Sequence, residues 1–438
     1  SPYIKFKDCY LTYTETYESG MLLHGLSALP CKDYTLSDMN NRLPYLNYIN
    51  DNGMGAKVDG LLNFKDLMMD PITVECCKKY NLPEDFTSLL IYASNLLVDN
   101  KYVIHTDMNG RRIRSTEIIS GYTYLAIAKA YQEYANQLRR GRKVPFTMKE
   151  SAVIDLIMVD PTFSDMPLLN DLQIFEASNA ISYKGLSGMN NDRSYSLDKR
   201  TFDPTMTNII SGMSTGFAGN VGINRQLTID PNVETNKGFT KTTDDAGSAD
   251  KGVTKTFSMT EAIAPYGTTR NDPMRSAMNF IQTSNHSMRV TKGSPALVTT
   301  GADQALPYLS DNTFSYKAKL AGKVISISND AMIVEYKDST RDMIDMRNKM
   351  LKNSNGGFYT SSKLSTDLKV GQTFKAGQIL AYDKNMYSGD MMLGDNISYK
   401  VGTLSKLAIL NTSEGFEDSA VISETLSEQM ASDVVEIK

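Results

Sequence analysis

The spacing of apolar residues changes twice along this chain of 438 residues. They recur at three- and four-residue intervals after Ser115, follow no regular interval over 176–226, and alternate with polar residues beyond residue 313. The first pattern is typical of an amphipathic helix, and the last is typical of half-buried strands. At roughly 100–200 residues for each domain, the length indicates two to four domains. We therefore predict a multidomain α+β protein.

The helix after Ser115 is the clearest expected element. Its apolar face is made of Ile118, Tyr122, Leu125, Ala128, Tyr131, Ala135 and Leu138. The Ser115 hydroxyl can accept hydrogen bonds from amides of the first turn, and Glu117 suits the positive end of a helix. Gly141 permits a C-terminal cap, and Pro145 prevents continuation. The sequence predicts one long amphipathic helix between Ser115 and Gly141.

The part beyond residue 313 has the pattern of short strands. Residues 323–328 and 331–336 flank Asn329 and Asp330, a two-residue connection typical of a hairpin. We expect further short strands, rich in β-branched residues, over 370–382 and 396–410. These strands predict a β-barrel or β-sandwich, although not all of its strands need be present.

Charge and composition exclude several classes of protein. The 46 basic and 50 acidic side chains give a net charge of −4, which excludes a uniformly basic nucleic-acid binder but permits a local basic channel. No run approaches the ~18 apolar residues of a membrane span, and no export signal opens the chain. The four cysteines include adjacent Cys76 and Cys77, which lack the two-residue gap of a zinc site. We expect a reduced cytoplasmic protein with buried thiols and no zinc.

Two segments carry arginines beside other polar groups. RRIRS at 111–115 places three guanidiniums just before the long helix, and paired arginine forks suit a nucleic-acid backbone. The alternative is a solvated charged turn whose arginines pair with local acids. In 271–290, Arg275 precedes Gln282 and Asn285, which can share one helical face. This chemistry suits a triphosphate and the sugar edges of a nucleic acid, and the alternative is a structural arginine.

A third segment, GFEDSAVISE at 415–424, carries adjacent carboxylates. Glu417 and Asp418 could hold Mg²⁺ directly or through water, because magnesium prefers oxygen ligands and keeps several waters. The alternative is that Asp418 or Ser419 only caps a helix.

In this order, the three segments resemble the β subunit of multi-subunit, cellular-type RNA polymerases. Further segments of the same resemblance are NDLQIFEASNAISYKGLSGMNNDRSYSLDKR (170–200), FAGNVGINRQL (217–227), SPALVTTGADQAL (294–306), AGKVISI (321–327), VGQTFKAGQILA (370–381) and MMLGDNI (391–397). The Met-, Tyr- and Asn-rich sequence and the reduced ends resemble, more narrowly, one piece of the split β of phiKZ-like giant bacteriophage polymerases. The alternative function is a non-catalytic structural protein of a phage particle, suggested by loops rich in Thr, Asn, Gly and Tyr.

The resemblance implies roles for the residues in these segments. Arg275 would contact the triphosphate of the incoming nucleotide, and Glu417 with Asp418 would act near the second Mg²⁺ through water or other second-layer contacts. Asn285 stands where the family has a glutamine near the transcript. The nucleic-acid-binding residues that the resemblance implies are Arg111, Arg112, Arg114, Arg193, Asn220 and Asn285.

The resemblance also implies partners and a location. A β′-like subunit would hold Mg²⁺, and a second β-like polypeptide would carry the catalytic lysines, which follow GFEDS in the family whereas this chain ends at Lys438. The DNA template, the nascent RNA, NTPs and a promoter-specificity factor would complete the assembly, with no membrane. The subunit would be inactive alone, in the cytoplasm of the infected bacterium, with the virion as the alternative location.

The resemblance divides the chain into four regions. They are a remnant of the lobe or protrusion, a segment like the fork and rifampicin region, a mobile surface insertion poor in apolar residues, and a β-rich hybrid-binding half with an incomplete double-psi β-barrel. Their ranges are 1–100, 101–227, 228–256 and 257–438. In the rifampicin region the family's polar drug contacts are replaced by Pro167, Ala177 and Ala180, although Ser182 remains.

Overall fold

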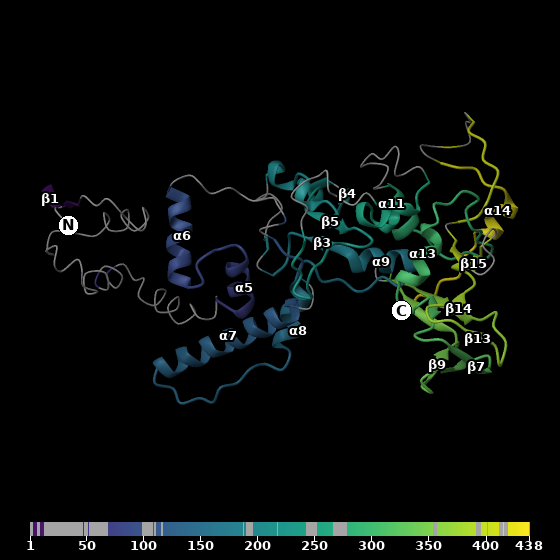
Figure 1. Cartoon of the computed structure of the whole chain (residues 1–438), viewed down its shortest axis with the longest axis horizontal. Helices are drawn as coiled ribbons and strands as arrows, with labels where there is room; N and C mark the ends of the chain where they lie inside the picture. Colours follow the sequence, from purple (N-terminus) through teal and green to yellow (C-terminus); the bar gives the residue numbers. More distant parts are fainter. Residues whose placement is uncertain are drawn as a thin grey trace. The chain divides into compact units, whose positions relative to one another are not determined.

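The computed structural model consists of two units, Ser1–His105 and Thr106–Lys438, which are described separately (Figure 1). The residues that it describes are 3–6, 9–12, 47, 51, 69–98, 108, 111–114, 117–186, 188–189, 196–216, 218–241, 252–265, 278–353, 357–390, 396–400, 402–410, 415 and 419–437. Among these residues, no helix is both long enough and apolar enough to cross a membrane.

In the first unit, the described residues include an antiparallel strand pair and two helices. They are β1 (Tyr3–Phe6), β2 (Cys9–Thr12), α5 (Pro71–Lys79) and α6 (Phe86–Val98). The Asp70 side chain accepts from the Thr73 amide at 2.7 Å, and Pro71 suits the first helical position because it has no amide to satisfy. The Cys77 thiol is free and buried and that of Cys76 is half-buried, as expected of reduced cysteines.

The long helix predicted after Ser115 is confirmed as α7 (Glu117–Arg139). The helix ends at Arg139 and is followed by the predicted cap at Gly141: the Gly141 amide donates to the Leu138 carbonyl at 2.9 Å, and the Arg142 amide donates to the Gln137 carbonyl at 3.1 Å. The chain then turns back along the helix to α8 (Ala152–Val159), which packs against α7 (Figure 1).

The buried face of α7 differs from the predicted one. Tyr122, Ala126 and Ala130 are buried, whereas Leu125 and Tyr131, predicted on the same face as Tyr122, are exposed. Apolar residues occur on more than one side of this helix, so their spacing alone does not select the side that packs. The buried stripe is narrow because two of its three residues are alanines.

The remaining elements of the second unit form short helices and small antiparallel sheets. The helices are α9 (Asp171–Asn179), α10 (Val253–Thr256), α11 (Met259–Ile263), the π-helix η8 (Phe280–Asn285), α13 (Ala302–Leu309) and α14 (Glu424–Gln429), with 3₁₀ turns η4 (Leu197–Arg200), η5 (Pro204–Met206) and η6 (Ala218–Asn220). The sheet orders are β3-β5-β4, β12-β14-β6, β13-β7-β8-β9, β10-β11 and β15-β16. The strands are β3 (Ala180–Ser182), β4 (Ile210–Thr215), β5 (Asn224–Leu227), β6 (Ser315–Lys317), β7 (Gly322–Ile327), β8 (Ala331–Tyr336), β9 (Arg341–Asp345), β10 (Lys349–Lys352), β11 (Tyr359–Ser362), β12 (Leu364–Ser365), β13 (Thr373–Phe374), β14 (Ile379–Asp383), β15 (Tyr387–Gly389) and β16 (Ile397–Tyr399).

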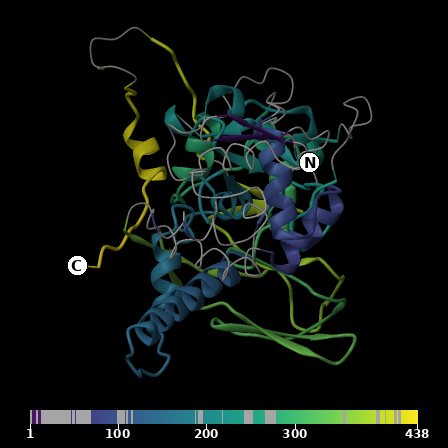
Figure 2. The same cartoon turned by 90° about the vertical axis from the view of Figure 1, so that its left-hand side faces the viewer.

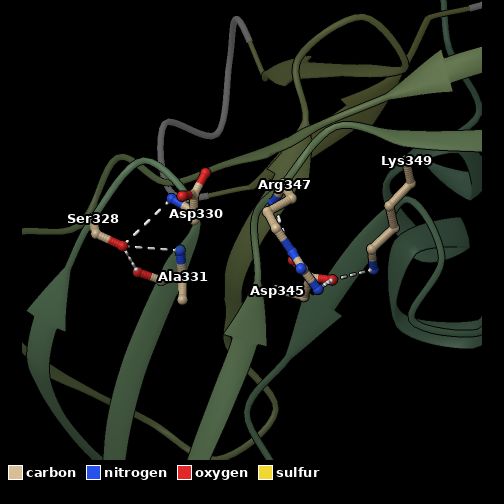
Figure 3. A network of polar contacts seen from close by, with 6 residues as sticks. All are labelled: Ser328, Asp330, Ala331, Asp345, Arg347 and Lys349. Carbon is tan, nitrogen blue, oxygen red and sulfur yellow. Dashed lines mark hydrogen bonds and ion pairs between the residues drawn. The ribbon is translucent and has the colours of Figure 1, made fainter.

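The predicted hairpin is confirmed by the pairing of β7 with β8, in which Val324 lies opposite Val334 (Figure 2, green strands). Its turn is held by Ser328, whose hydroxyl accepts from the Ala331 amide at 3.0 Å (Figure 3). After β9, the Asp345 carboxylate accepts from Nε of Arg347 at 3.0 Å (Figure 3). Local turn chemistry therefore fixes the β7–β8 turn and the exit from β9.

The expected barrel is not closed in the part of the chain that the structure describes. The strands expected over 370–382 are present as β13 and β14, but β16 is the only strand among the described residues of 396–410. Residues 402–410 form no strand, and Leu407 and Ile409 are 85% and 93% exposed. Short strands paired in small sheets cannot enclose a barrel, because closure requires every strand to have two neighbours.

The segment 228–256, expected to lie on the surface, is partly buried where the structure describes it. Thr228 and Phe239 are buried, and the Asn232 amide donates to the Asn208 carbonyl at 2.9 Å. Backbone hydrogen bonds and the Lys255–Asp230 ion pair also hold the segment, although its composition is poor in apolar residues. The mobility expected of it remains a prediction.

Among the described residues, one apolar core lies beneath the sheet β3-β5-β4. Its members come from that sheet and from the segments beside it, and they are Met108, Ile113, Ile181, Met206, Ile209, Ile210 and Leu227. This core therefore joins the segment 111–114 to the sheet, although the two are far apart in the sequence.

Candidate nucleic-acid interface

The arginine-rich segment 111–114 is held in place by Gly238. The Ile113 amide donates to the Gly238 carbonyl at 2.8 Å. Gly238 has φ of 80°, and a Cβ atom there would lie 1.6 Å from the Ile113 carbonyl oxygen. Only glycine permits both this conformation and this close approach. The position of the arginines on either side of Ile113 therefore depends on Gly238.

Arg111 packs on an aromatic ring at the end of β3. Its guanidinium carbon lies 4.6 Å from the centroid of the Tyr183 ring, and Nη1 donates to the Tyr183 hydroxyl. A guanidinium over a tyrosine face is favoured by the ring quadrupole. Arg111 and Tyr183 thus form one rigid, half-buried cationic pair.

The other two arginines of this segment have different partners. Arg112 forms an ion pair with Glu117 and also donates to the Lys237 carbonyl at 3.2 Å. Arg114 is exposed and donates to the Leu186 carbonyl at 2.6 Å. The alternative interpretation of 111–115, in which the arginines of a charged turn pair with nearby acids, therefore applies to Arg112. Arg114 instead bonds to a neutral carbonyl oxygen.

Asn220 lies next to a lysine that sequence reasoning missed. The Asn220 Oδ1 atom accepts from Nζ of Lys184 at 2.9 Å. Lys184 directly follows Tyr183, so Arg111 and Asn220 contact adjacent residues. Beside them, the Ser182 hydroxyl donates to Oδ1 of Asn224 at 2.7 Å across the strand pair β3 and β5.

Two further arginines lie nearby, of which Arg200 belongs to the cluster and Arg225 is buried beneath it. Arg200 donates through Nη1 to the Gly219 carbonyl at 2.9 Å. Arg225 is buried on β5, where burial lowers the pKa of its guanidinium, Tyr183 raises it and Arg111 lowers it. We call Arg111, Tyr183, Lys184, Arg200 and Asn220 the basic cluster.

The remaining predicted residues lie elsewhere or outside the described residues. Oδ1 of Asn285, at the end of η8, accepts from Nε2 of Gln173 at 3.4 Å. Gln173 is at the start of α9, whereas the basic cluster lies beyond the other end of that helix. Predictions that fall outside the described residues are those for Arg193, Arg275, Glu417 and Asp418. Within the described ranges, no three His, Cys, Asp or Glu side chains gather to hold a metal ion.

Helix α9, which leads into β3, is anchored by buried carboxylates. Glu176 Oε1 accepts from the amide and the hydroxyl of Thr260 at 2.7 and 2.5 Å, and burial raises the pKa of Glu176 to about 7. The Tyr387 hydroxyl donates to Asp171, and burial raises the pKa of that carboxyl to about 7. These contacts tie α9 to α11 and β15, and thereby set where β3 begins.

A family model described as bacteriophage RNA polymerase matches residues 2–192. This match supports the interpretation of the chain as phage RNA polymerase sequence. It also supports a role in transcription and an enzyme of the nucleotidyltransferase type. No curated protein matches the chain. The matched range contains the arginines of 111–114 together with Tyr183 and Lys184, so it covers much of the basic cluster.

Proposed function

We propose that this chain is part of the β subunit of a DNA-directed RNA polymerase, in the manner of the split β of phiKZ-like giant phages. In this proposal the basic cluster binds the phosphate backbone of the RNA–DNA hybrid or of downstream DNA. The observation that carries the proposal is that Arg111 and Asn220, from two separate segments, contact the adjacent residues Tyr183 and Lys184 just after β3.

The chemistry of the cluster suits a polyanion. Lys184 and Arg111 supply charge, Asn220 supplies an amide, and Tyr183 supplies an aromatic surface beneath the Arg111 guanidinium. Such groups bind phosphates mainly by electrostatic attraction and release of counterions, so affinity falls steeply with salt. A net charge of −4 is compatible with this, because the positive charge is local.

The remaining roles follow from the proposed family. Arg275 would stabilise the charge that builds on the leaving pyrophosphate as the RNA 3′-hydroxyl attacks the α-phosphate. Glu417 and Asp418 would act through water near the second Mg²⁺. Mg²⁺ stabilises the attacking and leaving oxygens in such enzymes, and a β′-like partner would hold it. A second β-like polypeptide would supply the catalytic lysines, so this chain would be inactive alone.

Binding of a labelled RNA–DNA hybrid with a downstream duplex tests the proposal. Fluorescence anisotropy of the full chain, measured over a series of salt concentrations, gives the slope of log affinity against log salt. Lys184→Ala should weaken binding and make the slope less steep by about 1, because one phosphate contact is lost. Arg347→Ala removes one charge from the exposed turn of Figure 3 and is the matched control.

Two results would overturn the proposal. One is the absence of salt-dependent binding by the wild-type chain, and the other is an equal effect of Lys184→Ala and Arg347→Ala. Co-purification separates the proposal from the alternative of a particle protein. Polymerase-like partners with template-dependent NTP incorporation support it, whereas incorporation of the chain into a particle without such activity contradicts it.

A further inference from the structure

Arg225 is a buried arginine whose contacts are to backbone carbonyls. It is 7% exposed, and its Nη2 and Nε atoms donate to the carbonyls of Arg200 and Gly222 at 2.6 and 3.4 Å. Its guanidinium carbon lies 5.8 Å from the centroid of the Phe202 ring. Within the described residues it forms no ion pair. Burying a cation raises the free energy of the folded state unless its donors are hydrogen-bonded. The question is therefore what Arg225 gains from bonding to two backbone carbonyls at this position.

The two carbonyls belong to segments that are pressed together. Gly222 has φ of 72°, and a Cβ atom there would lie 2.5 Å from the Arg200 carbonyl oxygen. The Arg200 side chain in turn donates to the Gly219 carbonyl at 2.9 Å. The turn 218–222 is therefore tied to Arg200 at both of its ends, and Arg225 bonds to both sides of this junction.

Asn220 lies inside the turn that Arg225 clamps. Because Nζ of Lys184 donates to Asn220, the turn also sets where that ammonium group lies. We infer that Arg225 is a positioning residue, which fixes the turn 218–222 so that Asn220 and Lys184 meet a nucleic-acid backbone in one geometry. Arg225 itself is buried and touches no ligand. This inference rests on the proposed function of the basic cluster.

A lysine cannot replace Arg225 in this role. The guanidinium is planar and presents several donors at fixed angles, so it can bond to two carbonyls while it lies on an aromatic ring. An ammonium group keeps the charge but not this fork. Arg225→Lys should therefore release the turn without changing the net charge of the chain.

The test uses the full chain and the labelled hybrid described above. Arg225→Lys should weaken binding about five- to tenfold, because two side chains that were preorganised must now be ordered on binding. The salt slope should stay at the wild-type value, since no phosphate contact is lost, in contrast to Lys184→Ala. Arg347→Lys is the matched control and should leave both affinity and slope unchanged.

A double-mutant cycle distinguishes positioning from general stability. In the Asn220→Ala background, Arg225→Lys should have a smaller effect on affinity than in the wild type, because the group that it positions is gone. Gly222→Ala perturbs the same junction from the opposite side, through its clash with Arg200, and should give the same loss with the same slope. This second variant keeps the test decisive if Arg225→Lys does not fold.

Three results would overturn the inference: unchanged affinity of Arg225→Lys, a slope less steep by about 1 as for a direct phosphate contact, or full additivity with Asn220→Ala. If the wild-type chain shows no salt-dependent binding, the proposed function itself fails, and that outcome is seen before any variant is compared.

Discussion

Replacing Glu176 by glutamine should change how the stability of the fold depends on pH. Glu176 is buried between α9 and α11, where Oε1 accepts two hydrogen bonds from Thr260 and Oε2 has no partner among the described residues. Burial raises its pKa from 4.5 to about 7, and the neighbouring Glu261 raises it further while the Thr260 bonds lower it. The folded chain thus keeps a proton that the unfolded chain releases.

The sign and size of the effect follow from this difference. Between the unfolded pKa of 4.5 and the folded pKa of about 7, the folded state binds one more proton at this site. The free energy of unfolding therefore falls by about 1.4 kcal/mol for each pH unit in this window, or by about 3 kcal/mol in all. Stability from this group is full below the window and is lost as pH rises through it.

Urea unfolding of the full chain, followed by circular dichroism from about pH 4.5 to about pH 8, measures the effect. Glu176→Gln cannot ionise, so its free energy of unfolding should fall less steeply with pH than that of the wild type. Asp171, whose pKa is also about 7, contributes equally in both proteins and cancels in the comparison. Glu428→Gln, on the exposed side of α14, is the control. An unchanged slope in Glu176→Gln would refute the reasoning.

Of three other predictions, the first concerns the candidate site and the other two concern the proposed function. Gly238→Ala should lower the free energy of unfolding by at least about 1–2 kcal/mol, because alanine is strained at this positive φ. It should also weaken hybrid binding by displacing 111–114. Gly389→Ala is the control because a Cβ atom has open space there, and an equal unfolding midpoint for the two variants would contradict the prediction. Arg275→Ala should slow elongation sharply while assembly persists, since losing one partner of a buried charged pair costs roughly 2–5 kcal/mol in general. If the variant enzyme elongates at the wild-type rate, Arg275 does not act at the nucleotide site. The assembled enzyme should tolerate rifampicin, because each lost polar contact costs about 1–3 kcal/mol; inhibition at concentrations that stop a bacterial polymerase would count against the alignment of Pro167, Ala177 and Ala180.

Local patterns in the sequence were enough to predict those elements that are determined by contacts between residues close together in the chain. The end of α7 depends on Gly141, and the β7–β8 turn depends on Ser328 and its neighbours, so both could be found from short segments. The buried side of α7 could not, because it depends on where α8 packs. The prediction of a strand near residue 409 was wrong for a related reason. Alternation of apolar and polar residues leads to a strand only where a neighbouring strand is present to pair with it.

The candidate site shows the same division between local and distant causes. The sequence drew attention to Arg111 and Asn220, but the residues that connect them, Tyr183 and Lys184, carry no motif of their own. Their contacts span long stretches of chain and depend on the core beneath β3-β5-β4. Gly238 marks a close crossing of two segments, but its positive φ and its distant neighbour are known only from the structure.

The partners of the arginines also explain how a site can be rigid and still attract an anion. Arg112 is paired with Glu117, so its charge is largely cancelled. Arg114 and Arg225 instead donate to carbonyl oxygens, which are neutral, so each side chain is held while its charge persists. A carboxylate partner would hold either guanidinium as firmly but would compete with a phosphate for the same field. Under the proposed function, an ion pair in place of the carbonyl contact of Arg114 should therefore hold the side chain but weaken binding of nucleic acid.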